Sequence, residues 1–156
     1  MDASPVTPQL EPLFRAVVTV AAPMSVGLTP AGERRIVPIT GGHFEGPALA
    51  GEVLPGGADW QVVRSDGTVR LEARYTLRTR DGALIYVRNR GVRAGSPDVL
   101  ARLARGEAVD PAQYYFRTVP EFETGAPAYA WLNDLVAIGS AARGPAAVTL
   151  RFFAVR

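Results

Sequence analysis

The stretch VRSDGTVRLEARYTLRTRDGALIYVRNRG, residues 63–91, predicts the central part of the fold. It contains two Asp-Gly pairs, Asp66-Gly67 and Asp81-Gly82, and each pair lies between runs of alternating apolar and polar residues. An Asp-Gly pair supplies the positive φ angle that a tight hairpin turn requires. The stretch therefore predicts an antiparallel meander of three strands, near residues 60–65, 69–79 and 82–91.

The middle strand of this meander has two chemically different faces. Successive side chains of a strand point to opposite sides of the sheet, so every second residue shares a face. One face is predicted to hold Leu71, Ala73, Tyr75 and Leu77, and the other Arg70, Glu72, Arg74 and Thr76. The first face is apolar and is expected to face the core.

Similar short runs of β-branched, aromatic and alternating residues occur on both sides of the meander. They predict strands at residues 13–20, 34–39, 48–54, 58–63, 113–119, 128–133, 135–140 and 147–155. One segment differs, because Ser96 is suited to cap a helix N-terminus and Gly106 is suited to end it. It predicts a short helix over residues 97–105 whose narrow apolar stripe lies on the sheet as a lid or plug.

These elements indicate an all-β protein with a single antiparallel β-barrel of about 8–10 strands and one short helix. Residues 1–9 show no periodicity and are predicted to form a flexible N-terminal tail. Residues 10–156 are then expected to form the barrel domain, which agrees with the usual size of one domain.

Composition narrows the class of protein. The chain of 156 residues is 47% hydrophobic and 21% charged, which is typical of a globular protein. No cysteine is present, and the first residues lack the basic and apolar segments of a secretory signal, so we expect a cytoplasmic protein. The 17 basic and 15 acidic residues are spread along the chain, so we expect neither a nucleic-acid nor a membrane partner.

The stretch ITGGHFEGPALAGEVLPGGADWQ, residues 39–61, contains six glycines and the single histidine. Its glycine spacing partly matches a phosphate-binding loop, but Pro47-Ala48 stands where that loop needs lysine and a hydroxyl residue. Glycines within strands also mark sharp bends and close backbone approach, which a small closed barrel needs. We therefore interpret the stretch as sheet bent at corners, with His43 more often a surface residue than a catalyst.

Three long blocks resemble a known family: PITGGHFEGPALAGEVLPGGADWQ, ARYTLRTRDGALIYVRNRG and YYFRTVPEFETGAPAYAWLN. The chain is similar to an uncharacterised bacterial and fungal family, the domain of unknown function numbered 3237, from about Leu10 to Val155. The resemblance implies a small β-barrel, broadly like lipocalins, streptavidin and allene oxide cyclase, often assembled into homo-oligomers. It implies no particular reaction.

A ligand site in a barrel is expected where polar groups interrupt the apolar inward face or lie at its mouth. The candidate catalytic residues are Asp59, Tyr75 and Arg117. The candidate substrate-binding residues are Gln61, Asn89, Trp131, Asn133, Glu123 and His43, and no metal site or cofactor is expected. Several of these residues stand in the blocks that resemble the family.

Each candidate also has a structural interpretation. Alternation favours Asp59 and Gln61 facing solvent while Trp60 and Val62 fill the core. Arg117 then pairs with a nearby glutamate, Asn133 is a turn residue, and Trp131 is a core aromatic. The sequence leaves both sets of interpretations open.

Three functions follow from these alternatives. The first is a cofactor-independent isomerase, cyclase or lyase that acts on a small aromatic or carbonyl compound by acid–base chemistry in the barrel mouth. The second is a non-catalytic, lipocalin-like carrier or sensor of a small apolar ligand. The third is a structural interaction module whose interior is plugged to a few tens of Å³, well below the roughly 300 Å³ of common ligand pockets. A homodimer is the expected assembly in each case.

Overall fold

In a computed structural model, which describes residue 1 and residues 3–156, the chain forms a closed antiparallel β-barrel with eight strand positions. The strands follow one another around the barrel in the order β1, β10, β9, β8, β7, β6, and then β4 and β5 together. β4 and β5 share one position, because each pairs with a different half of β3 and of β6. Pairing between β3 and β1 closes the ring, and β2 extends from β3 as a hairpin.

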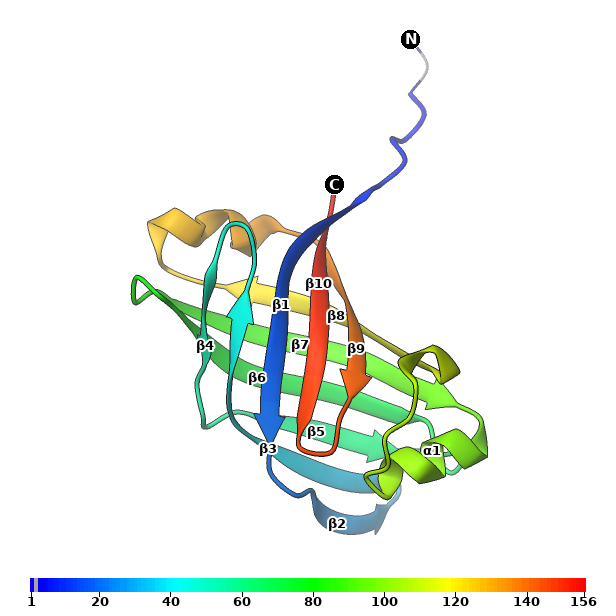
Figure 1. The fold of residues 1–156 in the computed structure, drawn as a ribbon. Coiled ribbons are helices and arrows are strands. Elements are labelled where there is room, and N and C mark those ends of the chain that lie inside the picture. The colour runs from blue at the N-terminus through cyan, green and yellow to red at the C-terminus, as the bar shows by residue number, and fades with distance from the viewer. Residues whose placement is uncertain (2) are drawn as a thin grey trace.

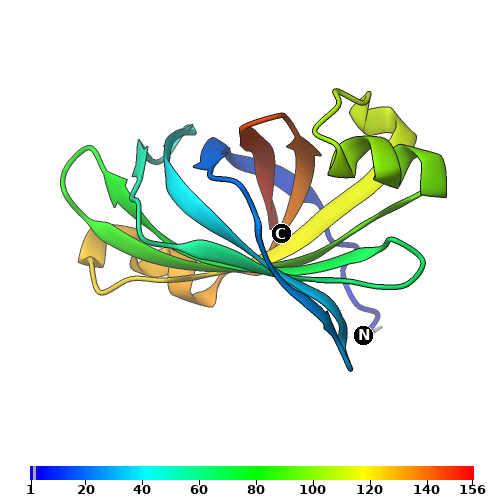
Figure 2. The same cartoon turned by 90° about the horizontal axis from the view of Figure 1, so that it is seen from below.

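The bounds of the strands are β1 Leu10–Val20, β2 Met24–Thr29, β3 Gly32–Glu45, β4 Ala50–Val53, β5 Ala58–Val63, β6 Val69–Thr79, β7 Leu84–Gly95, β8 Tyr114–Glu123, β9 Ala137–Arg143 and β10 Ala147–Val155. The helical elements are α1 Pro97–Ala104 and the short 3₁₀ segments η1 Pro111–Gln113 and η2 Pro127–Asp134. Figure 1 shows β1, β9 and β10 crossing β6, β7 and β8 at a steep angle. Figure 2 shows the same two layers from below, with α1 beside one end of the barrel.

The predicted meander forms the longest part of this sheet. β6 and β7 pair from Val69 opposite Arg93 to Arg78 opposite Leu84. Gly67 and Gly82 have φ angles of +85° and +89° at the two turns, as their Asp-Gly pairs predicted. Leu71, Tyr75 and Leu77 are buried, which confirms the apolar face of the middle strand.

The glycine-rich stretch is bent sheet, as predicted. Gly42 has φ +136°, and a Cβ atom there would lie 2.0 Å from the carbonyl oxygen of Val17 on β1. A Cβ atom on Gly51 would lie 2.0 Å from the carbonyl oxygen of Arg78 on β6. Only glycine permits such close backbone contacts, so these positions allow β3 and β4 to join the closed ring.

Four phenylalanines fill one half of the barrel. Phe14 lies between Phe44, Phe122 and Phe152, with ring centroids 5.3, 5.8 and 4.9 Å away. All four side chains are buried, and Phe122 also meets Phe152 edge to face. We call this group the phenylalanine plug. It leaves the other half of the interior as the place for a site.

The helix prediction is confirmed, one strand prediction is wrong, and one strand of the structure was not predicted. α1 begins at the Ser96 cap, whose hydroxyl accepts a hydrogen bond from the backbone N–H of Val99, and its apolar side is buried. Residues 128–133 were predicted as a strand but belong to η2, where Asn133 hydrogen-bonds the backbone of Thr124 on both sides of its amide. β2 was not predicted, because most of its side chains are exposed and so show no buried alternation.

The start of the chain lies apart from the barrel. Residues 3–9 carry no helix or strand, and residue 2 of the predicted flexible tail lies outside the described residues. Gln9 exchanges two backbone hydrogen bonds with Arg156, which anchors the tail where β1 and β10 meet. Within the described part of the chain, no helix is both long and apolar enough to cross a bilayer.

Candidate functional site

The barrel half opposite the phenylalanine plug contains a cavity of about 60 Å³, whose lining is mostly apolar but includes several buried polar side chains. It lies toward the end where β5 turns into β6, where α1 connects β7 to β8, and where β9 turns into β10; we call this the α1 end. The cavity is lined by Val18, Val20, Val37, Ile39, Asp59, Gln61, Leu71, Ala73, Tyr75, Asn89, Arg93, Phe116, Thr118, Arg143, Gly144, Val148 and Leu150. Four of the five buried polar or charged side chains in the described residues belong to this lining.

The strand registers place these polar side chains at successive depths. Asp59 and Asn89 lie on either side of Ala73, one on each neighbouring strand, and therefore point into the same level of the barrel. Tyr75 lies one level deeper, toward the plug, about 7 Å along β6. Arg93 lies nearer the open end, four residues or roughly 13 Å along β7 from Asn89.

A chain of hydrogen bonds holds the carboxylate of Asp59. The amide nitrogen of Gln61 donates to Asp59 Oδ2 at 2.7 Å, and Arg35 donates to the amide oxygen of Gln61 at 2.9 Å. The Arg35 bond fixes which way the Gln61 amide faces, because its oxygen must accept. One oxygen of Asp59 is thereby held, and the other is left for a different partner.

Five buried polar atoms in this region have no hydrogen-bond partner among the described residues: Arg35 Nε, Asp59 Oδ1, Asn89 Oδ1, Arg93 Nε and Thr118 Oγ1. Four of the five residues line the cavity, and the fifth, Arg35, donates to one that does. Buried polar atoms are almost always hydrogen-bonded, and leaving one without a partner costs about 1–3 kcal/mol. A cluster of them around one cavity indicates a place where water or a polar group of a ligand completes the hydrogen bonding.

The surroundings of Asp59 make its carboxyl group a stronger base than an exposed one. Burial raises its pKa above the ordinary value, while the Gln61 hydrogen bond and the charge of Arg93 partly oppose that rise. Burial raises the pKa of the Tyr75 hydroxyl, and the charge of Asp59 raises it further. Tyr75 therefore keeps its proton at neutral pH and can act as a hydrogen-bond donor.

Three arginines surround the open end of the cavity: Arg35 on β3, Arg93 on β7 and Arg143 on β9. Burial, with repulsion from Arg143 and Arg35, lowers the pKa of Arg93 to about 10, so it stays charged near neutrality. Among the described residues, no group of three or more His, Cys, Asp or Glu side chains is arranged to hold a metal ion. The charge next to Asp59 is cationic, which favours an anion at this position.

A second hollow adjoins the cavity at the α1 end. It has a volume of about 280 Å³ and lies between α1 and the turn that joins β5 to β6. Arg35 and Arg93 line it, together with Leu100 and Ala104 of the helix. We call it the vestibule. Arg93 lines both spaces, so a ligand that reaches from the vestibule to Asp59 passes its guanidinium.

The raised pKa of Asp59 gives a stability prediction. The folded protein binds this proton more tightly than the unfolded chain, whose aspartate pKa is about 3.9, so ionising Asp59 costs stability as the pH rises. This stability is fully present below the unfolded pKa and is lost as the pH rises through the folded pKa. Above the folded pKa, we expect the free energy of unfolding of Asp59→Asn to exceed that of the wild type by about 1.4 kcal/mol for each unit of pKa elevation, relative to their difference at low pH. Urea unfolding from pH 4 to pH 8 measures the difference, and a difference that is constant across this range would contradict it.

The interpretation that Asp59 and Gln61 face solvent is corrected. Gln61 is 3% exposed and lines the cavity, whereas Trp60 is 40% exposed on the outer face. Residues directly opposite on paired strands point to the same side, and Asp59 and Gln61 lie opposite the inward Ala73 and Leu71. Trp60 lies opposite Glu72, which faces outward.

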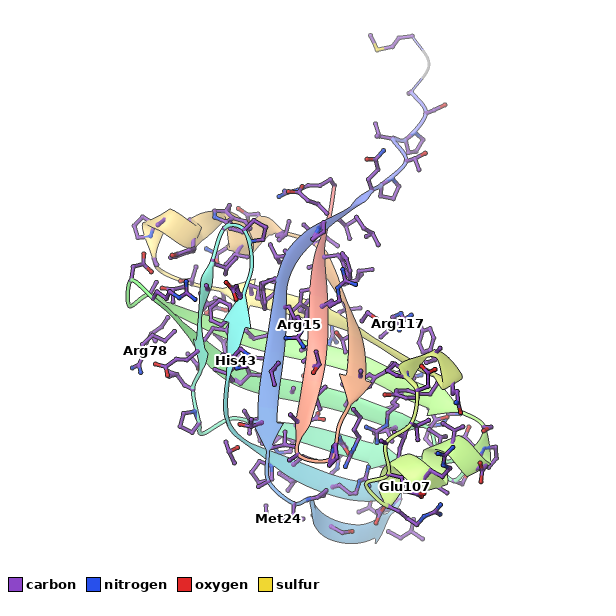
Figure 3. All side chains as sticks on the ribbon, in the orientation of Figure 1. Arg15, Met24, His43, Arg78, Glu107 and Arg117 are labelled. Atoms are coloured by element: carbon purple, nitrogen blue, oxygen red, sulfur yellow. The ribbon has the colours of Figure 1, made fainter. Side chains whose placement is uncertain are left out.

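The structure places Asp59, Gln61, Tyr75 and Asn89 in one cavity, and the other candidates outside it. Arg117 is exposed on β8 with its guanidinium over the ring of Tyr115, and His43 is exposed on β3 between Val17 and Glu52 (Figure 3). Glu123, Trp131 and Asn133 are also exposed; Trp131 and Asn133 belong to η2 and Glu123 ends β8. Trp131 is therefore not the core aromatic of the structural interpretation.

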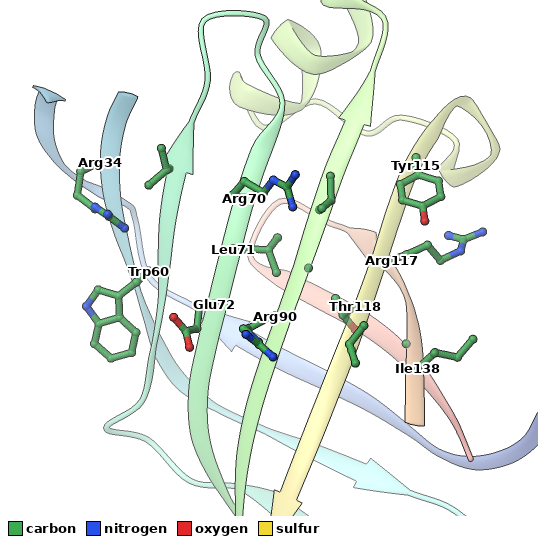
Figure 4. Close-up of a pocket in the computed structure, with 15 residues that line it drawn as sticks. Arg34, Trp60, Arg70, Leu71, Glu72, Arg90, Tyr115, Arg117, Thr118 and Ile138 are labelled. Carbon is green, nitrogen blue, oxygen red and sulfur yellow. The ribbon is translucent and has the colours of Figure 1, made fainter. Parts of the chain in front are cut away.

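Arg117 belongs to a broad groove on the outer face, of about 860 Å³. Figure 4 shows Arg34, Trp60, Glu72, Arg90 and Arg117 spread across the strands that line it. Glu72 is the carboxylate in this lining, and its hydrogen bond from Arg88 holds its pKa below the ordinary value, so it is a weak base. The groove therefore offers no carboxylate of raised pKa among its lining residues, in contrast to Asp59 in the cavity. The homodimer expected from the sequence stays a prediction.

Sequence reasoning missed Arg35, Arg93, Arg143 and Thr118. The signal for Arg93 was present, because it continues the inward series of Ile85, Val87 and Asn89 on β7. The predicted strand ended at residue 91, two residues before Arg93, so the series was cut short. Thr118 shares the inward face of β8 with Phe116, which the same alternation reveals.

Comparison with family models and with known proteins relates this chain to an uncharacterised family. A model described as "Protein of unknown function (DUF3237)" matches residues 8–155. A UPF0311 protein of Rhodopseudomonas palustris is 47% identical over 139 residues, which is 88% of this chain and 91% of that protein. The hydroalkoxylation enzyme phnH of Penicillium herquei is 29% identical over 140 residues, which is 90% of this chain and 78% of that enzyme.

Solved structures agree with these sequence relations. A conserved protein of unknown function from Rhodopseudomonas palustris has a TM-score of 0.92 at 42% identity, over 98% of this chain and all of that one. A beta-barrel like protein from Acinetobacter baumannii has a TM-score of 0.88 at 46% identity, over 99% and 100% of the two chains. An enzyme from Penicillium herquei has a TM-score of 0.73 at 26% identity over the whole of both chains.

Proposed function

Because the chain belongs to the DUF3237 family, whose fungal relatives include an enzyme, we propose that it is a cofactor-independent acid–base enzyme. Its reaction is an isomerisation, cyclisation or elimination of a small carbonyl or aromatic compound at the α1 end of the barrel. The observation that carries this proposal is the carboxylate of Asp59. One of its oxygens is held by Gln61, and the other is buried in the cavity without a partner.

Asp59 is the general base in this proposal. Its Oδ1 takes a proton from a C–H or O–H group of the substrate, while Gln61 keeps the carboxylate from rotating. Burial raises the pKa of Asp59 toward the working pH, where a base combines a useful ionised fraction with sufficient basicity. A fixed base of raised pKa is what this chemistry requires.

Tyr75 is the donor that stabilises the negative charge. When Asp59 takes the proton, the electron pair of the broken bond moves onto the substrate's carbonyl or phenol oxygen, and the Tyr75 hydroxyl donates to that oxygen. The proton on Asp59 then returns to a different atom of the substrate, which completes an isomerisation with no net loss of atoms or electrons. This role was expected of Arg117 or Tyr75, and the exposed position of Arg117 favours Tyr75.

The fungal relative supports a reaction of this type. Hydroalkoxylation adds an alcohol O–H group across a carbon–carbon double bond, so one proton leaves oxygen and one arrives at carbon. A base and a proton donor in a water-poor cavity supply both transfers. The full sequence of this chain contains neither cysteine nor lysine, so its own side chains offer no thiolate or lysine Schiff base.

The size of the cavity favours an enzyme over a carrier. A carrier encloses its ligand, and small-molecule pockets commonly run from about 300 Å³. Here about 60 Å³ surrounds Asp59, enough for the reacting atoms alone, and the remaining space lies outside in the vestibule. The volume of about 60 Å³ is also the size expected of a structural module, so volume alone does not separate these two functions. What favours an enzyme over a structural module is the set of buried polar side chains that enter a mostly apolar cavity, with Asp59 Oδ1 among their atoms without a hydrogen-bond partner in the described residues.

Proton exchange tests the proposal without knowledge of the natural substrate. The protein is incubated in D₂O with a panel of aryl ketones, 2-oxo acids and 2′-hydroxychalcone, and ¹H NMR follows the loss of exchangeable C–H signals and any cyclisation. We expect at least one compound to react faster with the wild type than with Asp59→Asn. Equal rates for the two proteins on every compound would refute the proposal.

A further inference from the structure

The open end of the cavity carries three arginines whose positive charges are not neutralised by ion pairs within the described part of the chain. Arg35, Arg93 and Arg143 come from three different strands, and among the described residues none of them forms an ion pair with a carboxylate. Arg93 is only 3% exposed. A buried arginine is normally paired with an acid or with a bound anion. Asp59 lines the cavity beside Arg93 and Arg143, and Asp66, which lines the vestibule with Arg35 and Arg93, is already paired with Arg64.

The three arginines lie close enough to repel one another. The charges of Arg143 and Arg35 each lower the pKa of Arg93, and that of Arg35 also lowers the pKa of Arg143, in both cases after burial as the main cause. The carboxylate of Asp59 acts on both in the opposite direction. Asp66 of the vestibule is neutralised by its ion pair with Arg64, so the three arginines and an ionised Asp59 together leave an excess of two positive charges.

Two of these guanidinium groups have a buried donor without an acceptor. The Nε atoms of Arg35 and Arg93 have no hydrogen-bond partner among the described residues. The guanidinium of Arg93 lies over the ring of Phe116, with its central carbon 5.6 Å from the ring centroid. Arginine is only a donor, so these atoms need an acceptor, and a planar guanidinium matches a planar carboxylate.

We propose that Arg93, with Arg35 and Arg143, binds the carboxylate of a small organic acid and that the substrate belongs to this class. The inference rests on the proposed function, because it places the substrate in the same cavity. A carboxylate at Arg93 directs the rest of the molecule either inward to Asp59 and Tyr75 or outward into the vestibule. In the inward orientation, oxo and unsaturated carboxylic acids present to Asp59 the acidic C–H group next to their carbonyl group or double bond.

Benzoate and its neutral twin benzamide test the inference by isothermal titration calorimetry. We expect benzoate to bind, and we expect benzamide to bind at least about 10-fold more weakly, because it cannot form charge-assisted hydrogen bonds with the arginines. Arg93→Met is expected to weaken benzoate by about 10- to 100-fold. Arg151→Met, which removes an exposed arginine on β10, serves as the matched control and keeps the wild-type affinity.

Asp59→Asn separates this inference from the proposed function. Removing the carboxylate removes its repulsion of an incoming anion, so we expect benzoate to bind this variant more tightly while proton exchange is lost. Tighter benzoate binding with unchanged exchange would refute the base and leave the anion site intact. If Asp59→Asn loses proton exchange as expected but the wild type binds benzoate and benzamide with equal affinity, the anion site alone would be refuted.

Further outcomes keep the test decisive if Arg93→Met does not fold. Arg143→Met changes a half-buried residue next to the turn between β9 and β10, and we expect at least a few-fold loss of benzoate affinity. Unchanged benzoate affinity in a folded Arg93→Met or Arg143→Met protein would overturn the inference. Inorganic phosphate that binds more tightly than benzoate would overturn the choice of a carboxylate.

Discussion

Replacing Asp59 with asparagine is expected to lower the rate of proton exchange by about 10³-fold, within the 10²–10⁴-fold range typical of a lost general base. Asparagine keeps the size of the side chain and an oxygen for the Gln61 hydrogen bond, but it cannot accept a proton at neutral pH. The measurement is the initial rate of deuterium incorporation into the most responsive compound of the panel. Because the variant is expected to be more stable than the wild type at neutral pH, lost activity would not reflect unfolding.

The pH dependence of the wild type supplies an independent check. As a base, Asp59 acts only when ionised, so the rate should rise with pH through a pKa that lies above the ordinary aspartate value. Tyr75→Phe should lower the rate by a smaller factor and leave this profile in place, because the donor stays protonated over the same range. A rate that is independent of pH between 4 and 8, or an Asp59→Asn protein with more than a tenth of wild-type activity, would contradict the assignment.

Local patterns were enough to predict the barrel because they encode turns and alternation. The Asp-Gly pairs set the hairpins on either side of β6, and the run Ala58–Val63 was identified as a strand with its observed bounds. The same reasoning gave a wrong result for η2, which was predicted as a strand. Its letters alternate as in a strand, but Pro127 begins a 3₁₀ turn and Asn133 ties it back to Thr124. That contact lies nine residues away and has no local signature.

The site was predicted in part because inward direction depends on pairing. Alternation divides β5 into Asp59 with Gln61 and Trp60 with Val62, but it does not say which pair faces the core. Hydrophobicity favoured Trp60, and register with Ala73 and Leu71 decided for Asp59. A buried polar pair costs stability, so a rule based on hydrophobicity alone chooses the wrong face where a carboxylate lies inside the barrel.

The two halves of the barrel differ in how their interior groups are partnered, although one buried apolar cluster runs through both. The phenylalanine plug buries four aromatic side chains in mutual contact, whereas the half at the α1 end holds unpartnered polar atoms and like charges. Those features cost free energy in the folded state. The apolar core must offset these costs, and the plug is its most aromatic part, so a substitution there should have a large effect on unfolding.

Phe152→Ala is expected to lower the free energy of unfolding by about 3–5 kcal/mol, the range for removing a buried phenylalanine side chain. Phe152 is 1% exposed, and its ring lies 4.9 Å from that of Phe14 and 6.0 Å from that of Phe122. The neighbouring Phe153 points to the opposite side of β10, where the guanidinium of Arg151 covers its ring. Phe153→Ala is thus a matched control on the same strand, with an expected loss of about 1 kcal/mol or less.

Urea unfolding of the two variants at one pH measures both losses, and benzoate titration shows whether the effect stays local. We expect folded Phe152→Ala to bind benzoate with wild-type affinity, because the plug and the arginines occupy opposite halves of the barrel. Equal losses of stability in Phe152→Ala and Phe153→Ala would mean that the plug does not hold the ring closed. A large loss of benzoate affinity in Phe152→Ala at full folding would mean that the two halves are coupled, because the cavity then depends on side chains that do not line it.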